Sequence, residues 1–592
     1  MALIVQKFGG TSVADSQKIL AAARIAIRAQ QQGNQVVMVV SAMGHSTDEL
    51  IDLAHQITDE PAAREMDMLL STGEQVSVAL MAMAIHTLGH QAVSLTGAQI
   101  GIRTDSKHTK ARIRSISTER VQRLLDAGNI VIAAGFQGID EDFNVTTLGR
   151  GGSDTTAVAL AAVLRADSCE IYTDVDGVYT TDPRILPEAR RVQRISYDEM
   201  LELASLGAGV MHNRSIEFAK KFGVPIHVRS SFSDAPGSMI VAEPESSTAA
   251  VSGAALMKDE ARVSVLDVPD VPGTSLELFS RIANRNISVD MIVQNVGENG
   301  KADISFTVPK NELRSTLEAV RQAAHVLGAA EINSDENVAK VSVVGLGMAR
   351  QAGVAHRMFR ALANANVNIQ MISTSEIKIS TLVERGSAQA ALRASHEAFH
   401  LEREPASCPP PGVSVAPTPD AAQVASRLNG LNMEELTIDD IALDVSQARI
   451  TMRGVPDTPG VAATVFEEVA AADVFVDMIV QSCNGRQGQA SLSFTVPQDR
   501  LEQGLRVARQ LAERFKCDSV TSSPKIAKLS VSGVGLRSQT GVAIRMFRAL
   551  AEAGINLEMI NTSEVRVNVV VDGRYADEAL KRLQTVFADV LR

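Results

Sequence analysis

Through about residue 240, short apolar runs alternate with longer stretches of helix-favouring composition. Three runs, at residues 3–5, 36–40 and 130–134, are apolar at every position, which is typical of strands buried on both faces of a parallel sheet. Ala-rich stretches typical of crossover helices accompany them, at residues 16–32, 74–88 and 155–164. This pattern predicts an α/β sandwich.

The second half of the chain repeats itself. Residues 268–273 (VPDVPG) return 187 residues later as 455–460 (VPDTPG), and residues 353–362 (GVAHRMFRAL) return 188 residues later as 541–550 (GVAIRMFRAL). Matches of this length at a nearly constant spacing indicate a duplicated unit. Within each unit a weaker echo of turn, helix and strand indicates two small α+β modules, so four modules are predicted in all.

The predicted domains are an α/β domain at residues 1–245, a first pair of modules at 246–400 and a second pair at 437–592. Residues 401–436 join the two pairs. They contain the segments CPPPG and APTP, whose prolines favour extended backbone over helix or sheet. We interpret this stretch as a Pro-rich linker.

Composition narrows the class of partner. The 592 residues are 45% hydrophobic and 21% charged, as in soluble globular proteins, and are too many for one core. A net charge of −12 without a long basic run argues against nucleic acid or an anionic membrane and favours small molecules. The four cysteines are scattered, and we find no secretory signal and no apolar run of membrane-spanning length, so a cytoplasmic protein is predicted.

Glycine-containing loops follow the predicted strands. Residues 7–12 (KFGGTS) come directly after the first strand, where backbone amides at a helix N-terminus can bind phosphate and Lys7 can add a positive charge. Residues 41–44 (SAMG) occupy the same place after the second strand. Each loop taken alone is equally consistent with an ordinary strand-to-helix turn.

The loop at residues 149–154 (GRGGSD) is more specific. Its glycines offer closely spaced amides, Arg150 can hold a carboxylate through two hydrogen bonds, and Asp154 suits a helix cap or the orientation of a cation. A plain capped turn would rarely need all of these features, so we favour a functional loop. Residues 172–179 (YTDVDGVY) add Asp174 and Asp176, but their spacing is not that of an EF-hand loop, and metal binding by these two alone is the less favoured interpretation.

Two GxG segments, at residues 344–350 and 532–537, lack the third glycine of a dinucleotide-binding fingerprint. We interpret both as strand-to-helix turns of the repeated modules. His212 and His227 are interpreted as structural residues.

Taken together and in this order, residues 7–12, 71–75 (STGEQ), 149–154 and 172–179 resemble the signature set of the aspartate kinases within the amino acid kinase family. The C-terminal modules resemble ACT domains, which bind small amino acids. The resemblance covers the chain except for the linker. It implies a three-layer α/β/α amino acid kinase sandwich followed by four small ferredoxin-like α+β ACT modules. Two pairs of modules depart from the single pair that is usual in the family.

The resemblance also implies the active-site residues. The expected catalytic residues are Lys7 and Asp154, without a general base, because the β-carboxylate of aspartate is already ionised near neutral pH. The expected ATP-binding residues, with Mg²⁺ carried on the ATP, are Lys7, Phe8, Gly9, Gly10, Ser41, Thr173, Asp174, Tyr179 and Arg184. The expected aspartate-binding residues are Thr47, Glu74, Arg150, Gly151, Gly152, Ser153 and Asp154. Arg150 suits the α-carboxylate of aspartate and Glu74 its ammonium group.

The modules are expected to bind lysine, threonine or both as feedback inhibitors, and to join two chains in a homodimer. In the first unit the resemblance places Asp270, Gly273, Ser275 and Gln294 with Asn368 and Ile369. In the copy it places Asp457, Gly460, Ala462 and Gln481 with Asn556 and Leu557. Plain turn chemistry at Asp270 and Asp457 is the alternative.

Two other functions stay open at this point. One is a different amino acid kinase, acting on glutamate or uridylate, which would share the fold and the glycine loops. The other is an amino-acid sensor whose kinase-like half is only a scaffold. Glu74, Arg150 and the appended modules favour aspartate, and the presence of Lys7 and Asp154 favours an enzyme.

Overall fold

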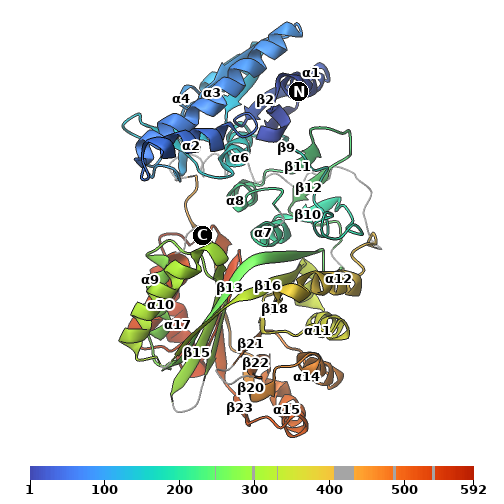
Figure 1. Cartoon of the computed structure of the whole chain (residues 1–592), viewed down its shortest axis with the longest axis vertical. Coiled ribbons are helices and arrows are strands. Elements are labelled where there is room, and N and C mark those ends of the chain that lie inside the picture. Colours follow the sequence, from blue (N-terminus) through green and yellow to red (C-terminus); the bar gives the residue numbers. More distant parts are fainter. Residues whose placement is uncertain are drawn as a thin grey trace.

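The structure is a computed structural model. It describes residues 1–207, 209–246, 249–296, 300–329, 331–351, 353–405, 433–483, 488–536 and 541–591. Figure 1 shows two lobes stacked along the long axis, an N-terminal α/β lobe and a larger lobe built from small α+β modules. Helices α7 (Tyr197–Ser205) and α8 (Asn213–Phe222) lie at the junction between the lobes.

An eight-stranded sheet forms the centre of the N-terminal lobe. Its order is β10 (Arg194–Ser196), β12 (Ser238–Val241), β11 (Ile226–Ser230), β9 (Ser168–Thr173), β1 (Leu3–Phe8), β2 (Gln35–Val40), β6 (Ile130–Ala134) and β3 (Ala92–Leu95). Neighbouring strands in it are parallel except β11 and β12, which are antiparallel. The three predicted apolar runs are neighbouring central strands, which confirms their assignment.

Successive side chains of the central strands enter two different cores, as a sheet covered on both faces requires. Val36, Met38 and Val40 pack with α1 (Ser16–Gln31) and α3 (Ala63–Thr87). Val37 and Val39 point to the opposite face, where α5 (Glu119–Asp126), α6 (Gly152–Leu164), α7 and α8 supply the core. The predicted three-layer sandwich is confirmed. The helix predicted at residues 74–88 is longer than expected, because it begins at Ala63 and ends at Thr87.

Helix α3 is long and apolar enough to span a membrane, and it is the one such helix in the described part of the chain. Over half of its most apolar stretch, 56%, is buried in the lobe. The sequence expectation counted uninterrupted apolar runs, and Glu74 interrupts this one. Buried Asp67 and Glu74 on α3 fit a core helix that carries site residues.

The N-terminal lobe also contains a further helix and a second sheet. Helix α2 (Ser46–Ile57) packs against α3. A four-stranded sheet has the order β5 (Ile113–Ile116), β4 (Ile102–Thr104), β7 (Gln137–Ile139) and β8 (Val145–Thr147). Strand β8 leads directly into residues 149–154.

The second lobe contains the four expected modules. Module 1 has β13 (Gly253–Pro269), α9 (Thr274–Ala283), β14 (Asp290–Val296), β15 (Lys301–Pro309) and α10 (Leu313–Leu327), and module 2 has β16 (Glu331–Val344), α11 (Val354–Asn364), β17 (Met371–Thr374), β18 (Lys378–Glu384) and α12 (Ala388–Ala398). Module 3 has β20 (Gln447–Pro456), α14 (Val461–Ala471), β21 (Ile479–Cys483), β22 (Gln489–Pro497), α15 (Leu501–Phe515) and β23 (Ser519–Ser523). Module 4 has β19 (Thr437–Asp444), β24 (Ile526–Val534), α16 (Gly541–Glu552), β25 (Met559–Thr562), β26 (Arg566–Asp572) and α17 (Ala576–Val586).

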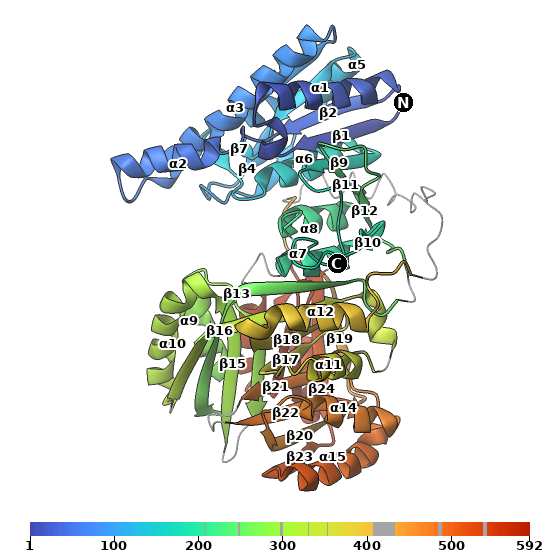
Figure 2. The same cartoon turned by 45° about the vertical axis from the view of Figure 1, so that its right-hand side comes forward.

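The modules associate across the duplication. A ten-stranded sheet runs β14-β15-β13-β16-β18-β17-β21-β22-β20-β23, so β17 of module 2 pairs with β21 of module 3. Module 4 has its own sheet, β19-β24-β26-β25, and its β25 lies against β14 of module 1. Helix α11 likewise contacts α14, and α9 contacts α16. Modules 2 and 3 are therefore side-by-side partners, as are modules 1 and 4. Figure 2 shows α11 of module 2 beside α14 of module 3.

The GxG segment that begins at Val344 is a strand-to-helix turn, as interpreted. Residues 346–350 form a short 3-10 helix between β16 and α11. A Cβ on Gly345 would lie 2.3 Å from Ala250 O, so close backbone packing explains this glycine. Part of the second GxG segment, and residues 406–432 of the predicted linker, lie outside the described residues.

Candidate active site

The carboxyl ends of the central strands carry the predicted loops. Lys7 is near the end of β1, and its Nζ lies 2.6 Å from Oδ1 of Asp154 in the first turn of α6. Both side chains are only 12% exposed, so water screens this ion pair weakly. The pair holds the Lys7 ammonium at the edge of the sheet where ligands bind in open α/β folds.

The glycine loops after β1 and β2 interlock. Gly44 N donates to Gly10 O at 3.0 Å. A Cβ on Gly10 would lie 2.9 Å from Ala42 O and 3.1 Å from Gly44 O. The first loop needs glycine for this close approach, and the two loops form one wall of the site.

Glu74 reaches this wall from α3. Its Oε1 accepts a hydrogen bond from Ala42 N at 3.1 Å, while its Oε2 is buried and has no hydrogen-bond partner among the described residues. Burial of the carboxylate raises the pKa of Glu74 from 4.5 to about 7, against the opposing effect of its hydrogen bonds. A buried acceptor without a partner is costly, and here it suits a cationic group of a ligand.

A tight turn presents Arg150. Gly152 N donates to Gly149 O at 2.9 Å, and Gly151 has φ 73° and ψ 10°, the values of the third residue of a type II turn. A Cβ on Gly151 would also lie 2.3 Å from the Cβ of His212, so only glycine fits. Arg150 stands at the tip of this turn, is exposed, and forms no ion pair with another described residue.

His212 has the structural role that was expected. It is the N-cap residue of α8 and packs against the turn at Gly151. Burial lowers the pKa of His212, although the neighbouring carboxylate of Asp154 acts in the opposite direction. Because its pKa is lowered, the His212 ring adds little positive charge beside the guanidinium groups of Arg214 and Arg150 at neutral pH.

The predicted nucleotide residues continue along the same edge. The Phe8 ring is buried and stacks on Tyr172, with centroids 4.8 Å apart, so only the backbone of Phe8 can face a ligand. Thr173 ends β9 and its hydroxyl donates to Asp174 Oδ1 at 3.0 Å. The Tyr179 hydroxyl donates to Asp176 Oδ1 at 2.8 Å, which leaves Asp176 less suited to a metal.

Three further predicted residues are placed as follows. Arg184 is 87% exposed and forms a two-bond pair with Asp182, with a shortest distance of 2.8 Å. Thr47 is in the first turn of α2, directly after the loop that contains Ser41, and both side chains are half-buried. These positions agree with a rim around the loops, and their binding roles remain predictions.

Residues 2–230 match the amino acid kinase family, and residues 261–325, 341–399, 450–511 and 529–587 match the ACT domain. The aspartate kinase Ask_LysC of Stutzerimonas stutzeri is 52% identical over 404 residues, which are 68% of this chain and 98% of that protein. The chain belongs to the aspartokinase family. It is accordingly an ATP-dependent kinase with ACT domains.

Solved structures of the family agree. The crystal structure of aspartate kinase from Synechocystis has a TM-score of 0.52 and 42% identity, and the match covers 99% of this chain and 98% of that one. E. coli aspartokinase III in complex with aspartate and ADP has a TM-score of 0.57 and 25% identity over 67% of this chain and 100% of that one. The same enzyme with lysine and aspartate has a TM-score of 0.54.

The predicted effector residues of this aspartokinase gather at two equivalent interfaces. Between modules 2 and 3, Asn368 Nδ2 donates to Asp457 Oδ1 at 2.9 Å and Gln481 Nε2 donates to Ile369 O at 2.8 Å. Gly460 and Ala462 line a pocket at this interface together with these four residues.

Between modules 1 and 4 the pattern recurs. Asn556 Nδ2 donates to Asp270 Oδ1 at 2.7 Å, and Gln294 Nε2 donates to Leu557 O at 2.7 Å. Ser275 Oγ adds a bond to Gln294 Oε1 at 2.8 Å. Gly273 caps α9 with φ 97°, a left-handed conformation that favours glycine.

The sequence-based pairing of these residues was wrong. It grouped Asp270 and Gln294 with Asn368, whereas they meet Asn556 and Leu557, and the copy is exchanged in the same way. Duplicated modules carry the same contact surfaces, so the sequence alone cannot tell a partner within one unit from a partner in the other. The pairing of β17 with β21 decides it.

Sequence reasoning also missed two cavities at these module interfaces. One, of about 310 Å³, is lined by Thr374, Ser375 and Glu376 together with Asp473 and Asp477 of module 3. The other, of about 90 Å³, is lined by the equivalent Thr562, Ser563 and Glu564 and by Asp290. The repeat of TSE at a spacing of 188 was the signal that could have found them.

Proposed function

We propose that this chain transfers the γ-phosphoryl group of ATP to the β-carboxylate of L-aspartate, giving 4-phospho-L-aspartate. The observation that carries the proposal is the set of charges at one edge of the sheet. The Lys7–Asp154 ion pair lies there with the unpartnered Oε2 of Glu74 and the exposed Arg150. A zwitterion with a second carboxylate needs a cation and an anion held apart in this way, and the E. coli relative was crystallised with aspartate and ADP.

Each side chain has a role that follows from its charge. Arg150 binds the α-carboxylate of aspartate and Glu74 Oε2 accepts from its ammonium group. Lys7 stabilises the charge that spreads over the transferred phosphoryl oxygens, and Asp154 holds the Lys7 ammonium in place. The attacking β-carboxylate is already ionised, so positioning and charge stabilisation are sufficient for catalysis.

The glycine loops suit a nucleotide phosphate. Gly9 N already donates to Tyr172 O at 3.3 Å, so the proposed phosphate contact begins at Gly10, the first residue of a 3-10 helix, where the approach of an anion is favourable. No group of three His, Cys, Asp or Glu side chains that could hold a metal occurs in the described ranges, and Mg²⁺ typically keeps phosphate and water ligands with only one or two carboxylates. Asp154, in the first turn of α6, is the proposed carboxylate that would orient Mg²⁺ carried on ATP. The Mg²⁺ would neutralise phosphate charge.

The test is a trapping assay. Incubation of the full chain with ATP, Mg²⁺, L-aspartate and hydroxylamine should form aspartyl hydroxamate. Glutamate in place of aspartate should give little product, and the Lys7→Ala variant should give none. Absence of product with aspartate would reject the proposal, while product with glutamate alone would favour another amino acid kinase.

We further propose that the end products lysine, threonine or both inhibit the enzyme by binding between paired modules. We also propose that the enzyme is a cytoplasmic homodimer that acts at the start of the biosynthesis of these amino acids. The side-chain amides of Asn368, Gln481, Asn556 and Gln294 at the two interfaces support amino-acid binding there. Glu376, Asp473 and Asp477 line the larger cavity. Each is already ion-paired, with Arg566, Arg500 and Lys528 respectively, so their charges do not by themselves select lysine over threonine. Calorimetry that detects neither amino acid binding to the full chain would reject this part.

A further inference from the structure

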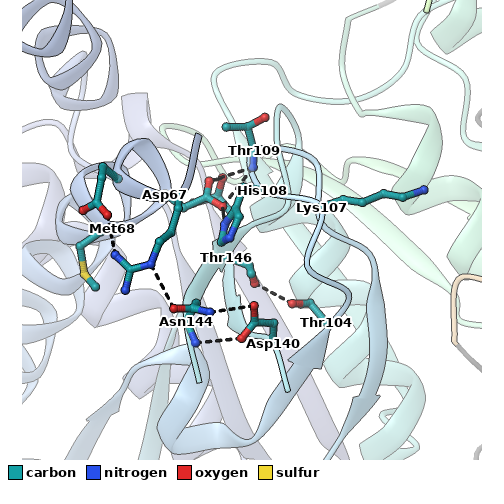
Figure 3. A network of polar contacts seen from close by, with 12 residues as sticks. Asp67, Met68, Thr104, Lys107, His108, Thr109, Asp140, Asn144 and Thr146 are labelled. Carbon is teal, nitrogen blue, oxygen red and sulfur yellow. Dashed lines mark hydrogen bonds and ion pairs between the residues drawn. The ribbon is translucent and has the colours of Figure 1, made fainter. Parts of the chain in front are cut away.

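A buried carboxylate on α3 organises the loops beside the predicted substrate turn. Asp67 is fully buried and lies on the same helix as Glu74, two turns before it. Figure 3 shows the backbone of Thr109 and the ring of His108 directed toward Asp67, while Lys107 points away. The proposed catalytic residues do not include any member of this network.

Asp67 accepts hydrogen bonds from three residues of two separate segments. Thr109 N donates to both carboxylate oxygens at 3.0 Å, and His108 Nδ1 lies 2.7 Å from Oδ2. The Thr147 hydroxyl donates to Oδ1 at 2.5 Å. Thr109 is held at φ 66°, a conformation that a β-branched residue rarely adopts, so these bonds maintain a strained loop.

The two segments meet at the first residue of the substrate turn. Thr147 precedes Gly149 by two residues, and Ala111 N donates to Thr147 O at 2.9 Å. A Cβ on Gly149 would lie 2.9 Å from Thr109 O, so Gly149 packs directly on the strained loop. Asp67 thus fixes one end of the turn, while His212 contacts its other side at Gly151.

We propose that Asp67 is a positioning residue that acts through Arg150. By holding Thr147 and Thr109 it sets the place of Gly149, and the turn from Gly149 to Gly152 then aims the guanidinium of Arg150. This inference rests on the proposed function, because the role of Arg150 in binding aspartate is itself proposed. It predicts that damage to the network weakens aspartate binding and leaves ATP binding intact.

The chain offers a closely matched pair of variants. Thr147 and Thr146 are adjacent on β8, both are buried, and each hydroxyl forms one buried hydrogen bond. The Thr146 hydroxyl bonds Thr104 at 2.7 Å instead of Asp67 (Figure 3). Thr147→Val and Thr146→Val therefore remove the same group from the same strand, and only the first touches the network.

Steady-state kinetics on the full chain test the proposal. Thr147→Val should raise the KM for aspartate about tenfold, with the KM for ATP changed less than about twofold, because a small misplacement of a binding group is costly. Thr147→Ser should restore the KM, and Thr146→Val should leave it near the wild-type value. Asp67→Asn should act in the same direction as Thr147→Val; if it does not fold, Thr147→Val still decides.

A double-mutant cycle asks whether the effect passes through Arg150. In an Arg150→Ala background, Thr147→Val should change the aspartate KM by less than about twofold, since the group it positions is gone. Equal effects of Thr147→Val and Thr146→Val, or full additivity with Arg150→Ala, would overturn the positioning role while aspartate kinase activity stands. A wild-type chain that forms no aspartyl hydroxamate would overturn both proposals.

Discussion

Nζ of Lys7 lies 2.6 Å from Oδ1 of Asp154, and this ion pair joins the end of the central strand β1 to the first turn of α6. The two residues are 147 positions apart in the chain and come together because β1 and α6 pack against each other. In the proposed mechanism, this ion pair holds the Lys7 ammonium beside the phosphoryl group that is transferred.

Replacing Lys7 should impair the chemical step. Lys7→Ala should lower kcat by at least about 100-fold, because it removes a charge that stabilises the transition state. The rate of hydroxamate formation at saturating aspartate and ATP measures kcat. Lys18→Ala, which removes a half-exposed lysine from α1, is the control and should keep nearly full activity. A Lys7→Ala enzyme within a factor of three of wild type would contradict the assigned role.

The central strands and the four modules could be predicted because their signals are local. Short apolar runs rich in β-branched residues, such as residues 36–40, favour buried strands, and the duplication is visible as repeated letters. The glycine loops were predictable from the close spacing of their glycines, although the contacts that require Gly10 and Gly151 are made with Ala42 and His212, which are distant in the sequence.

The partners of buried polar groups could not be predicted. Asp67 contacts Thr109 and Thr147, which are 42 and 80 residues away, and no spacing rule links them. The exchange of module partners is also invisible, since Asn368 and Asn556 occupy equivalent places in two copies. Long-range packing decides both, and it depends on the whole fold.

Glu74 should make aspartate binding pH-dependent. Burial raises the pKa of Glu74 to about 7, so the carboxylate becomes protonated as the pH falls through that value. A protonated Glu74 cannot pair with an ammonium group, and the KM for aspartate should be about tenfold higher at pH 6 than at pH 8. The carboxylates of aspartate itself do not titrate in this window. A flat aspartate KM from pH 6 to 8 would argue against the pairing, and Glu74→Gln should give that flat profile.

The same residue should limit stability at high pH. The folded-state pKa of Glu74 is about 7 and its ordinary value is 4.5, so its ionisation in the fold costs up to about 3 kcal/mol above pH 7 and nothing below pH 4.5. Glu74→Gln should therefore raise the midpoint of thermal unfolding at pH 8 and leave it nearly unchanged at pH 5. Calorimetry of both proteins at both pH values measures this. An equal shift at the two pH values would show that packing, and not ionisation, is responsible.

The two effector interfaces can be separated by equivalent substitutions. Gln294→Ala alters the interface of modules 1 and 4, and Gln481→Ala alters that of modules 2 and 3. Each should weaken binding of the amino acid held at its own interface by about tenfold or more, because a buried backbone carbonyl loses its donor. Inhibition by lysine and by threonine, measured singly, reports the effect. Identical inhibition curves for both variants and wild type would place the effectors elsewhere.

A buried ion pair lies at the junction between the lobes. Lys378 Nζ of β18 lies 2.8 Å from Glu202 Oε2 of α7, and Glu564 N donates to Glu202 Oε1 at 2.9 Å. Glu202 is fully buried, and burial raises its pKa even with Lys378 beside it. Lys378→Met leaves this carboxylate without its counter-ion, so it should destabilise the chain by about 3–5 kcal/mol at pH 8. The loss should be smaller at pH 5, where Glu202 can take up a proton. Adding Glu202→Gln to Lys378→Met removes the uncompensated charge and should recover most of the thermal midpoint. A single variant as stable as wild type at pH 8 would show that the pair does not hold the lobes together.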